Sequence, residues 1–349
     1  MLLRSTERGL YCEAGDFYVD PWLPVERAVI THAHGDHLRW GCASYLASRE
    51  GERVTRTRLG LDADRLRTVG FGEAVTIGGV RVSLHPAGHI LGSAQVRVEH
   101  RGEVWVVSGD YKTEPDATCT PFEPVRCHTF VTESTFGLPI YRWEPQARVF
   151  AEIVRWWQGN REAGRASVLF GYALGKAQRL LAGVRGAEVG PIYTHGAVER
   201  LAQDYRDSGI AMPSTTYAAE LARGTDCAGA LVIAPPSAAG STWLRRFGPV
   251  STALASGWMR IRGARRWRAL DRGFVLSDHV DWPSLHDAIR ATGAECVLVT
   301  HGYREPVVRW LREHGLQAQA IASKWEGDEE EGAAPELEEP AVASEGPET

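Results

Sequence analysis

The segment THAHGDH, residues 31–37, places three histidines and an aspartate within six positions of a chain that has only 12 histidines in 349 residues. It follows RAVI, a short apolar run typical of a buried β-strand. Side chains alternate along a strand, so His32 and His34 should share one side, while Asp36 and His37 follow where the chain turns. Imidazole and carboxylate groups suit zinc, and also manganese or iron. The segment therefore predicts a metal site at a strand end.

One loop cannot complete such a site, because zinc takes four or five ligands and a pair of metals needs a shared ligand. Three further candidate ligands stand beside glycine at the ends of other predicted strands, namely His89, Asp110 and His301. Polar side chains at the ends of apolar runs are the distribution expected of a catalytic rim on a β-rich core. Together with the first segment, they predict a binuclear centre.

The apolar pattern divides the chain into an interrupted first part and an insertion. Residues 1–140 are rich in predicted strands, with a meander of alternating apolar and polar residues over 73–111. Residues 141–270 alternate strand-like and helical runs, which predicts a small parallel sheet flanked by helices. Residues 271–324 should return to the first architecture as strand, helix, strand, helix.

The end of the chain differs in charge from the rest. The whole chain has a net charge of -5, but its last 24 residues hold ten acidic residues and no basic one, so residues 1–325 carry +5. The composition of 325–349 predicts a disordered acidic tail, either solubilising or competing with nucleic acid for a basic surface. No run of 18 apolar residues, no signal-like N-terminus and no C-x-x-C pair occurs, so we expect a cytoplasmic protein without membrane contact.

The order of the motifs resembles that of the metallo-β-lactamase fold: H-x-H-x-D-H, a later Gly-His, a later Gly-Asp and a final histidine. The insertion before the last histidine resembles the β-CASP branch, the nucleic-acid-processing nucleases. The segments VTESTFG with Glu133, LSDHVDW with His279 and VTHGYRE with His301 support this branch. The resemblance covers residues 10–320 and extends to bacterial exonuclease-like proteins associated with DNA ligase. It implies an α/β fold: an αββα sandwich with an inserted β-CASP α/β domain.

The resemblance also implies two divalent ions, zinc or manganese, with Asp110 between them. The first ion would be held by His32, His34, His89 and Asp110. The second would be held by Asp36, His37, Asp110 and His301. Asp20 in YVDPW matches an aspartate that orients the site. Asp36 also counts as a catalytic candidate. His279 would be the general acid, with Glu133 as its carboxylate partner.

Arginine and tryptophan are interleaved in GWMRIRGARRWRALDRG, around residue 260. Such a composition suits phosphate contacts and base stacking, but a solvated basic face with tryptophan packed inward is an equal alternative. The candidate substrate contacts are Arg260, Arg262, Arg265, Arg266, Lys112 and Ser134. The Gly-Lys pair of GYALGKAQ lacks the rest of the P-loop pattern, which excludes an ATP site of that type.

These features predict a two-metal phosphodiesterase acting on DNA, as an exonuclease in DNA repair, with a DNA ligase and a helicase as partners implied by the resemblance. Three alternatives stay open: the same chemistry on RNA, a non-catalytic nucleic-acid-binding subunit, and a small-molecule hydrolase. The filled position of His301 favours RNA, because DNA-repair members of the branch often lack it. The complete set of candidate ligands argues against a subunit without activity.

Overall fold

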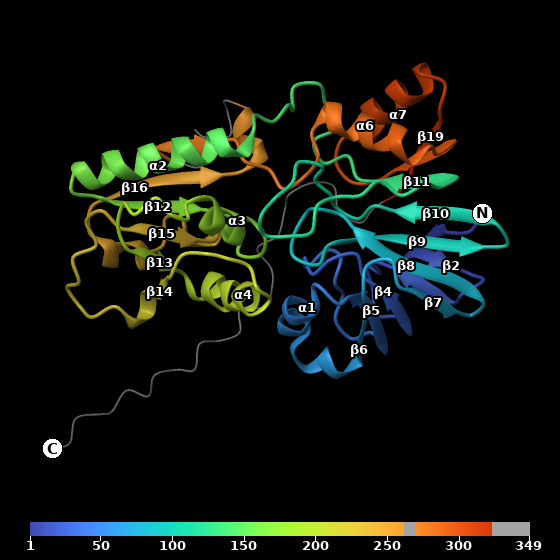
Figure 1. Cartoon of the computed structure of the whole chain (residues 1–349), viewed down its shortest axis with the longest axis horizontal. Helices are drawn as coiled ribbons and strands as arrows, with labels where there is room; N and C mark the ends of the chain where they lie inside the picture. Colours follow the sequence, from blue (N-terminus) through green and yellow to red (C-terminus); the bar gives the residue numbers. More distant parts are fainter. Residues whose placement is uncertain (262–269, 323–349) are drawn as a thin grey trace.

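The structure is a computed structural model that describes residues 1–261 and 270–322, and within these ranges it contains three β-sheets (Figure 1). The first sheet has its strands in chain order: β1 (Arg4–Thr6), β2 (Gly9–Cys12), β3 (Phe17–Val19), β4 (Arg27–Val29), β5 (Ser44–Ser48) and β6 (Leu66–Val69). Strands β3 to β6 pair in parallel. Helix α1 (Glu52–Leu59) and the 3-10 turn η1 (Gly60–Arg65) connect β5 to β6.

The second sheet combines strands from before the insertion with strands from after it. Its order is β19-β18-β11-β10-β9-β8-β7. The strands are β7 (Ala74–Ile77), β8 (Val80–Pro86), β9 (Ala94–His100), β10 (Glu103–Val107), β11 (Thr129–Thr132), β18 (Cys296–Val299) and β19 (Gln317–Ala320). Strands β7 to β10 form the antiparallel meander that the alternation over 73–111 predicts. Strand β19 was not expected from the sequence.

The first two sheets share one buried core. Val80, Val82 and Leu84 alternate along β8 and are completely buried, as a strand facing another sheet requires. Val29 of β4 and Leu46 of β5, from the first sheet, belong to the same cluster. Helices cover the outer faces. Helix α1 packs on the first sheet, and α6 (Trp282–Thr292) and α7 (Arg304–Glu313) pack on the second.

The third sheet is entirely parallel, with the order β14-β13-β15-β12-β16-β17. Its strands are β12 (Ala166–Phe170), β13 (Ile192–Thr194), β14 (Thr216–Tyr217), β15 (Leu231–Ala234), β16 (Val250–Ala255) and β17 (Arg272–Phe274). Helices α2 (Gln146–Glu162), α3 (Lys176–Gly183) and α4 (Gly196–Asp207) cover one face through Ile153, Leu180 and Val198. The mixed α/β class and the inserted parallel sheet are thus as predicted.

Two details of the insertion differ from the sequence-based expectation. The stretch after β15 was expected to be helical, but it forms only the 3-10 turns η3 (Pro236–Ala238) and η4 (Thr242–Phe247). The Pro235–Pro236 pair and the positive φ of Gly240 explain this, because proline lacks the amide donor and glycine favours chain reversal. Strand β17, expected in the return segment, pairs with β16 in the inserted sheet.

The insertion packs directly against the first part of the chain. Leu201 and Tyr205 of α4 belong to the buried cluster that lies on the outer side of the first sheet and includes Val54 of α1. The Tyr205 hydroxyl accepts a hydrogen bond from the backbone N–H of Leu91 at 3.1 Å. Figure 1 shows α4 beside α1, and the inserted sheet next to the strand ends of the two-sheet part. The parts of the fold therefore meet where the candidate site residues lie.

None of the helices in the described ranges has the length and apolarity needed to cross a bilayer.

The remaining 3-10 turns, η2 (Ala218–Glu220) and η5 (Gly257–Arg260), lie in the insertion. The predicted acidic tail, Arg262, Arg265 and Arg266 lie outside the described residues.

Candidate metal centre

The candidate ligands converge from the ends of four strands. His32 and His34 follow β4, His89 follows β8, Asp110 follows β10 and His301 follows β18. These strands belong to both sheets of the shared core, so their ends meet at one edge of the two-sheet part. Sheet packing therefore brings together residues that are up to 269 positions apart in the sequence, from His32 to His301.

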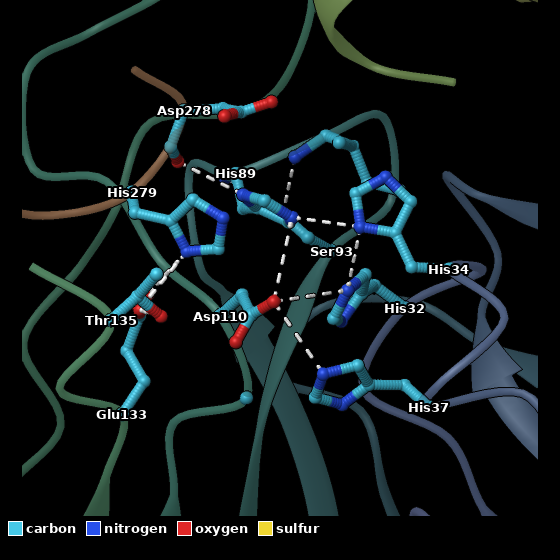
Figure 2. A network of polar contacts seen from close by, with 12 residues as sticks. His32, His34, His37, His89, Ser93, Asp110, Glu133, Thr135, Asp278 and His279 are labelled. Carbon is cyan, nitrogen blue, oxygen red and sulfur yellow. Dashed lines mark hydrogen bonds and ion pairs between the residues drawn. The ribbon is translucent and has the colours of Figure 1, made fainter. Parts of the chain in front are cut away.

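Three histidine nitrogens face one another. The distances from His34 Nδ1 to His32 Nε2 and to His89 Nε2 are both 3.1 Å (Figure 2). One oxygen of Asp110, Oδ2, lies 3.6 Å from His32 Nε2 and 3.9 Å from His89 Nε2. All four side chains are buried, and their donor atoms lie within 4.8 Å of one another. This arrangement is a four-ligand candidate metal site.

A second group of donors stands on the other side of Asp110. His37 Nε2 lies 3.4 Å from Asp110 Oδ2 and 3.4 Å from Asp36 Oδ2. The ring of His301 stacks on that of His37, with centroids 5.4 Å apart. His301 has a φ of 52°, an uncommon value for a residue with a side chain, and its carbonyl accepts a hydrogen bond from the Ser134 hydroxyl. Asp110 therefore lies between two groups of candidate ligands.

Asp20 fixes the orientation of His37. Its Oδ2 accepts from His37 Nδ1 at 2.7 Å and from the Thr31 hydroxyl at 2.6 Å, while its Oδ1 accepts from the Thr31 N–H at 2.8 Å. With Nδ1 engaged, His37 directs Nε2 toward Asp36 and Asp110. Such a contact to the outer nitrogen of a ligand histidine sets its tautomer and ring orientation.

The other histidines are held in the same way. His32 Nδ1 lies 3.0 Å from the Thr31 hydroxyl, His34 Nε2 lies 3.3 Å from the Leu174 carbonyl, and His89 Nδ1 lies 2.9 Å from the Asp278 carbonyl. Since a carbonyl can only accept, the outer nitrogens of His34 and His89 carry the protons. The inner nitrogens then present lone pairs to one another.

The donor set fits divalent ions on three observations. Burial lowers the pKa of His32, His34 and His89, the last to about 3 with His279 beside it, so these rings are neutral ligands. His37 Nε2 is buried without a hydrogen-bond partner among the described residues. Although burial lowers the pKa of His37, the carboxylates of Asp36, Asp110 and Asp20 raise it well above its usual value, which shows a negative field at that atom. Neutral imidazoles beside carboxylates suit zinc.

A histidine–carboxylate pair adjoins the cluster. His279, from the loop between β17 and α6, places Nδ1 2.9 Å from Oε2 of Glu133, and its ring centroid lies 4.7 Å from that of His89 (Figure 2). Burial would lower the pKa of His279, but Glu133, and then Asp110, raise it well above its usual value. Glu133 thus favours the protonated form of an imidazole that lies beside the metal-ligand candidates.

The candidate substrate contacts lie in other surroundings. Ser134 is buried, and its hydroxyl donates to the carbonyls of Thr300 and His301. Lys112 borders a surface pocket next to His279, but its Nζ is buried and donates to Ser277 O at 2.8 Å, with Glu114 Oε2 at 3.0 Å. Both side chains are therefore hydrogen-bonded within the fold. Arg260 is exposed, and its Nε donates to Ile140 O.

Sequence reasoning missed several residues that support the site. Thr31 touches both Asp20 and His32, and Thr135 donates to Glu133 Oε2 at 2.5 Å. Beside His89, buried Lys176 pairs with Asp278, and buried Arg179 pairs with Asp116 at 3.1 Å and donates to the His89 carbonyl. The position of Thr31 directly before His32 was a signal that could have been used. Nothing local marks Asp278 or Arg179.

Fold and site define a mixed α/β protein with a histidine–aspartate candidate metal centre. The chain is 34% identical over 320 residues to a protein named Probable DNA ligase from Opitutus terrae, a match covering 90% of this chain and 30% of that protein. It is 29% identical over 173 residues to Cleavage and polyadenylation specificity factor 73 of Drosophila melanogaster, a match covering 46% of this chain and 25% of that protein. It is 30% identical over 171 residues to Endoribonuclease ysh1 of Aspergillus fumigatus, a match covering 44% of this chain and 19% of that protein. The chain belongs to the β-CASP branch of the metallo-β-lactamase proteins.

The chain spans about a third or less of the length of these curated relatives. No protein-family model matches it. A solved structure of a protein of unknown function from Enterococcus faecalis V583 covers 78% of this chain and 74% of its own, with 12% identity and a TM-score of 0.49, which is too weak to define the fold.

Proposed function

We propose that the chain is a metal-dependent nuclease that hydrolyses phosphodiester bonds of DNA. The position of His279 carries this proposal, because its ring stands beside His89 while Glu133 holds its Nδ1. A cationic imidazole so placed can donate a proton to the leaving oxygen of a substrate at the neighbouring cluster. A small-molecule hydrolase has no evident need for the inserted sheet that packs beside this site.

We infer that the four layers, α1, two sheets and α6 with α7, are the αββα sandwich of the metallo-β-lactamase fold. The third sheet is then the β-CASP domain. Its expected span of 141–270 extends to Phe274 in this proposal, because β17 pairs with β16.

Two ions, with zinc preferred over manganese, fit the donors described. His32, His34, His89 and Asp110 would hold one, and Asp36, His37, His301 and Asp110 the other. Such ions supply Lewis acidity that activates water and neutralises charge on phosphate oxygens. The chain's own contribution is orientation: Asp20 fixes His37, and Glu133 turns His279 so that its other nitrogen points toward the side of His89 (Figure 2).

DNA is the proposed substrate because the match to the protein named Probable DNA ligase includes 90% of this chain. In that relative the matching segment and a larger remainder belong to one polypeptide. We therefore propose that this chain acts on DNA ends as an exonuclease in repair, in association with a DNA ligase.

RNA is a second candidate substrate. The relatives named endoribonuclease, which match from 33% to 44% of this chain, support it. His301, placed against His37, completes the second group of candidate ligands as expected of RNA-processing members.

The test is cleavage by purified protein of end-labelled single- and double-stranded DNA and RNA, with zinc or manganese added. Asp36→Ala is the matched control, since it removes one candidate ligand at the half-exposed side of the site. We expect DNA shortened from an end by the parent and intact DNA with Asp36→Ala. Cleavage of RNA alone would mean that RNA, and not DNA, is the substrate. Binding without any cleavage, in protein that holds its ions, would favour a non-catalytic subunit.

A further inference from the structure

Three cationic side chains are buried around one loop near the candidate metal centre. Lys176 and Arg179 from α3 of the insertion are each 1% exposed, and Lys112 is 2% exposed. Burying a cation is costly unless hydrogen bonds and counter-charges compensate it. All three donate to the carbonyls of loop residues 276–277, which directly precede Asp278 and His279. Three buried cations therefore hold this loop in place through hydrogen bonds to its carbonyls.

The contacts run from the insertion to a metal-ligand candidate. Lys176 Nζ lies 2.5 Å from Asp278 Oδ1 and donates to Leu276 O at 3.0 Å. Arg179 donates to Ser277 O at 3.0 Å and to the backbone carbonyl of His89 at 3.1 Å. The carbonyl of Asp278 in turn accepts from His89 Nδ1. Both partners of this last hydrogen bond are thus held by side chains of α3.

The residues before α3 reach a second ligand candidate. The Leu174 carbonyl lies 3.3 Å from His34 Nε2. Gly175 follows with a φ of 82°, and a Cβ there would lie 2.3 Å from Cγ2 of Ile90, the neighbour of His89. Only glycine allows the chain to pass this close. The segment 174–179 therefore contacts the surroundings of two of the three clustered histidines.

His37, in the other group of ligands, is held differently. Its Nδ1 donates to Asp20, and Thr31 stands beside it. Both residues come from the first part of the chain, and Asp20 lies on the connection between β3 and β4. Support from the insertion is therefore concentrated on His34 and His89.

We propose that segment 174–179 of the insertion is a positioning element for one of the two metal ions, the one held by His32, His34 and His89. The insertion then sets the affinity for that ion, beyond any role in covering substrate. Lys176 and Arg179 are positioning residues, since they act through the Asp278 carbonyl and the His89 backbone. This inference rests on the proposed two-ion centre.

The test is a zinc titration of the full chain in competition with a chromophoric chelator, which yields two dissociation constants. His34→Ala and His37→Ala assign each constant to its group of ligands. Lys176→Met removes the charge that holds Asp278, and we expect the dissociation constant of the His34 ion to rise about tenfold to a hundredfold. The other constant should change less than about twofold. Arg206→Met is the matched control, because Arg206 pairs with Glu199 at 3.0 Å within the same insertion.

Two further variants separate positioning from a general loss of fold. Asp278→Asn keeps the backbone carbonyl but breaks the ion pair, and it should show the same selective loss. Lys176→Arg keeps the charge and should retain more affinity than Lys176→Met. The inference would be overturned if Lys176→Met and Asp278→Asn lowered the affinity for both ions equally, or lowered neither.

The outcome also distinguishes this inference from the proposed function. A parent that binds two ions and cleaves nucleic acid, with unchanged constants in the variants, would defeat the inference alone. A parent that binds neither zinc nor manganese would defeat both. Selective loss at the His34 ion, with Arg206→Met like the parent, supports the inference whatever nucleic acid is cleaved.

Discussion

Nδ1 of His279 lies 2.9 Å from Oε2 of Glu133, although 146 positions and an entire inserted sheet separate the two residues in the chain. Glu133 is itself fixed, because Oε1 accepts from the Tyr111 N–H at 2.8 Å and Oε2 accepts from the Thr135 hydroxyl. A carboxylate held by these two donors cannot turn away from the imidazole. This pair is therefore suited to keep His279 protonated and correctly oriented.

Replacing Glu133 by glutamine should shift the pH dependence of cleavage. A general acid works while protonated, so activity falls as pH rises through the pKa of His279. Glu133 raises that pKa against the effect of burial, so its neutralisation should move the falling limb of kcat/KM to lower pH and lower the maximum by about 10²–10⁴-fold. Thr135→Val is the control that keeps the carboxylate. An unmoved limb in Glu133→Gln would mean that another group supplies the proton.

His279→Ala and Asp110→Ala should differ in metal content. His279 bonds Glu133, so its loss should abolish cleavage while the protein still takes up zinc. Asp110 Oδ2 faces His32, His37 and His89, so its loss should reduce zinc binding as well as cleavage. Metal analysis after gel filtration, together with the rise of the thermal midpoint on zinc addition, measures this, because an ion that binds only the folded state stabilises it. Parent-like cleavage by His279→Ala would exclude it as the acid.

Asp20→Asn should lower the affinity for the ion assigned to His37. Asparagine can keep the positive φ of 46° at this position, so the backbone is not the cause of any change. It replaces the charged acceptor of His37 Nδ1 by a neutral amide. We expect a tenfold to hundredfold higher dissociation constant for that ion, measured by chelator competition. The ion of His34 should keep its affinity, and an equal loss at both would show that Asp20 supports the centre as a whole.

His286 should make the free energy of unfolding depend on pH. Its ring lies between Trp282 and Trp310, with centroids 4.3 and 3.6 Å away, and burial with Arg290 and His314 lowers its pKa from 6.5 to about 4. The unfolded chain therefore takes up the proton first, and stability is lost as pH falls from about 6.5 toward about 4. His286→Phe should reduce the loss between about pH 7.5 and about pH 5 by roughly 1–2 kcal/mol in urea unfolding. An identical pH dependence in metal-free parent and variant would contradict this.

The sequence predicted strands correctly where apolar and polar residues alternate clearly, and it failed where this alternation is weak or short. The alternation over 73–111 gave the meander β7 to β10, because one face of each strand is buried. It did not predict β19, whose sequence QAQA has no apolar alternation beyond alanine. It also assigned β17 to the wrong sheet, because three residues do not show which neighbour they pair with.

The sequence by itself predicted four of the candidate donors, since His32, His34, Asp36 and His37 are close in any conformation of so short a segment. It also determined the order of the later motifs and thereby the family. The tertiary structure alone decided which side chain each orienting group contacts. Asp20 meets His37, and Lys176 meets Asp278 across 102 positions, only because the sheets and the insertion pack as they do. Contacts over such separations depend on the packing of whole elements, which local sequence does not encode.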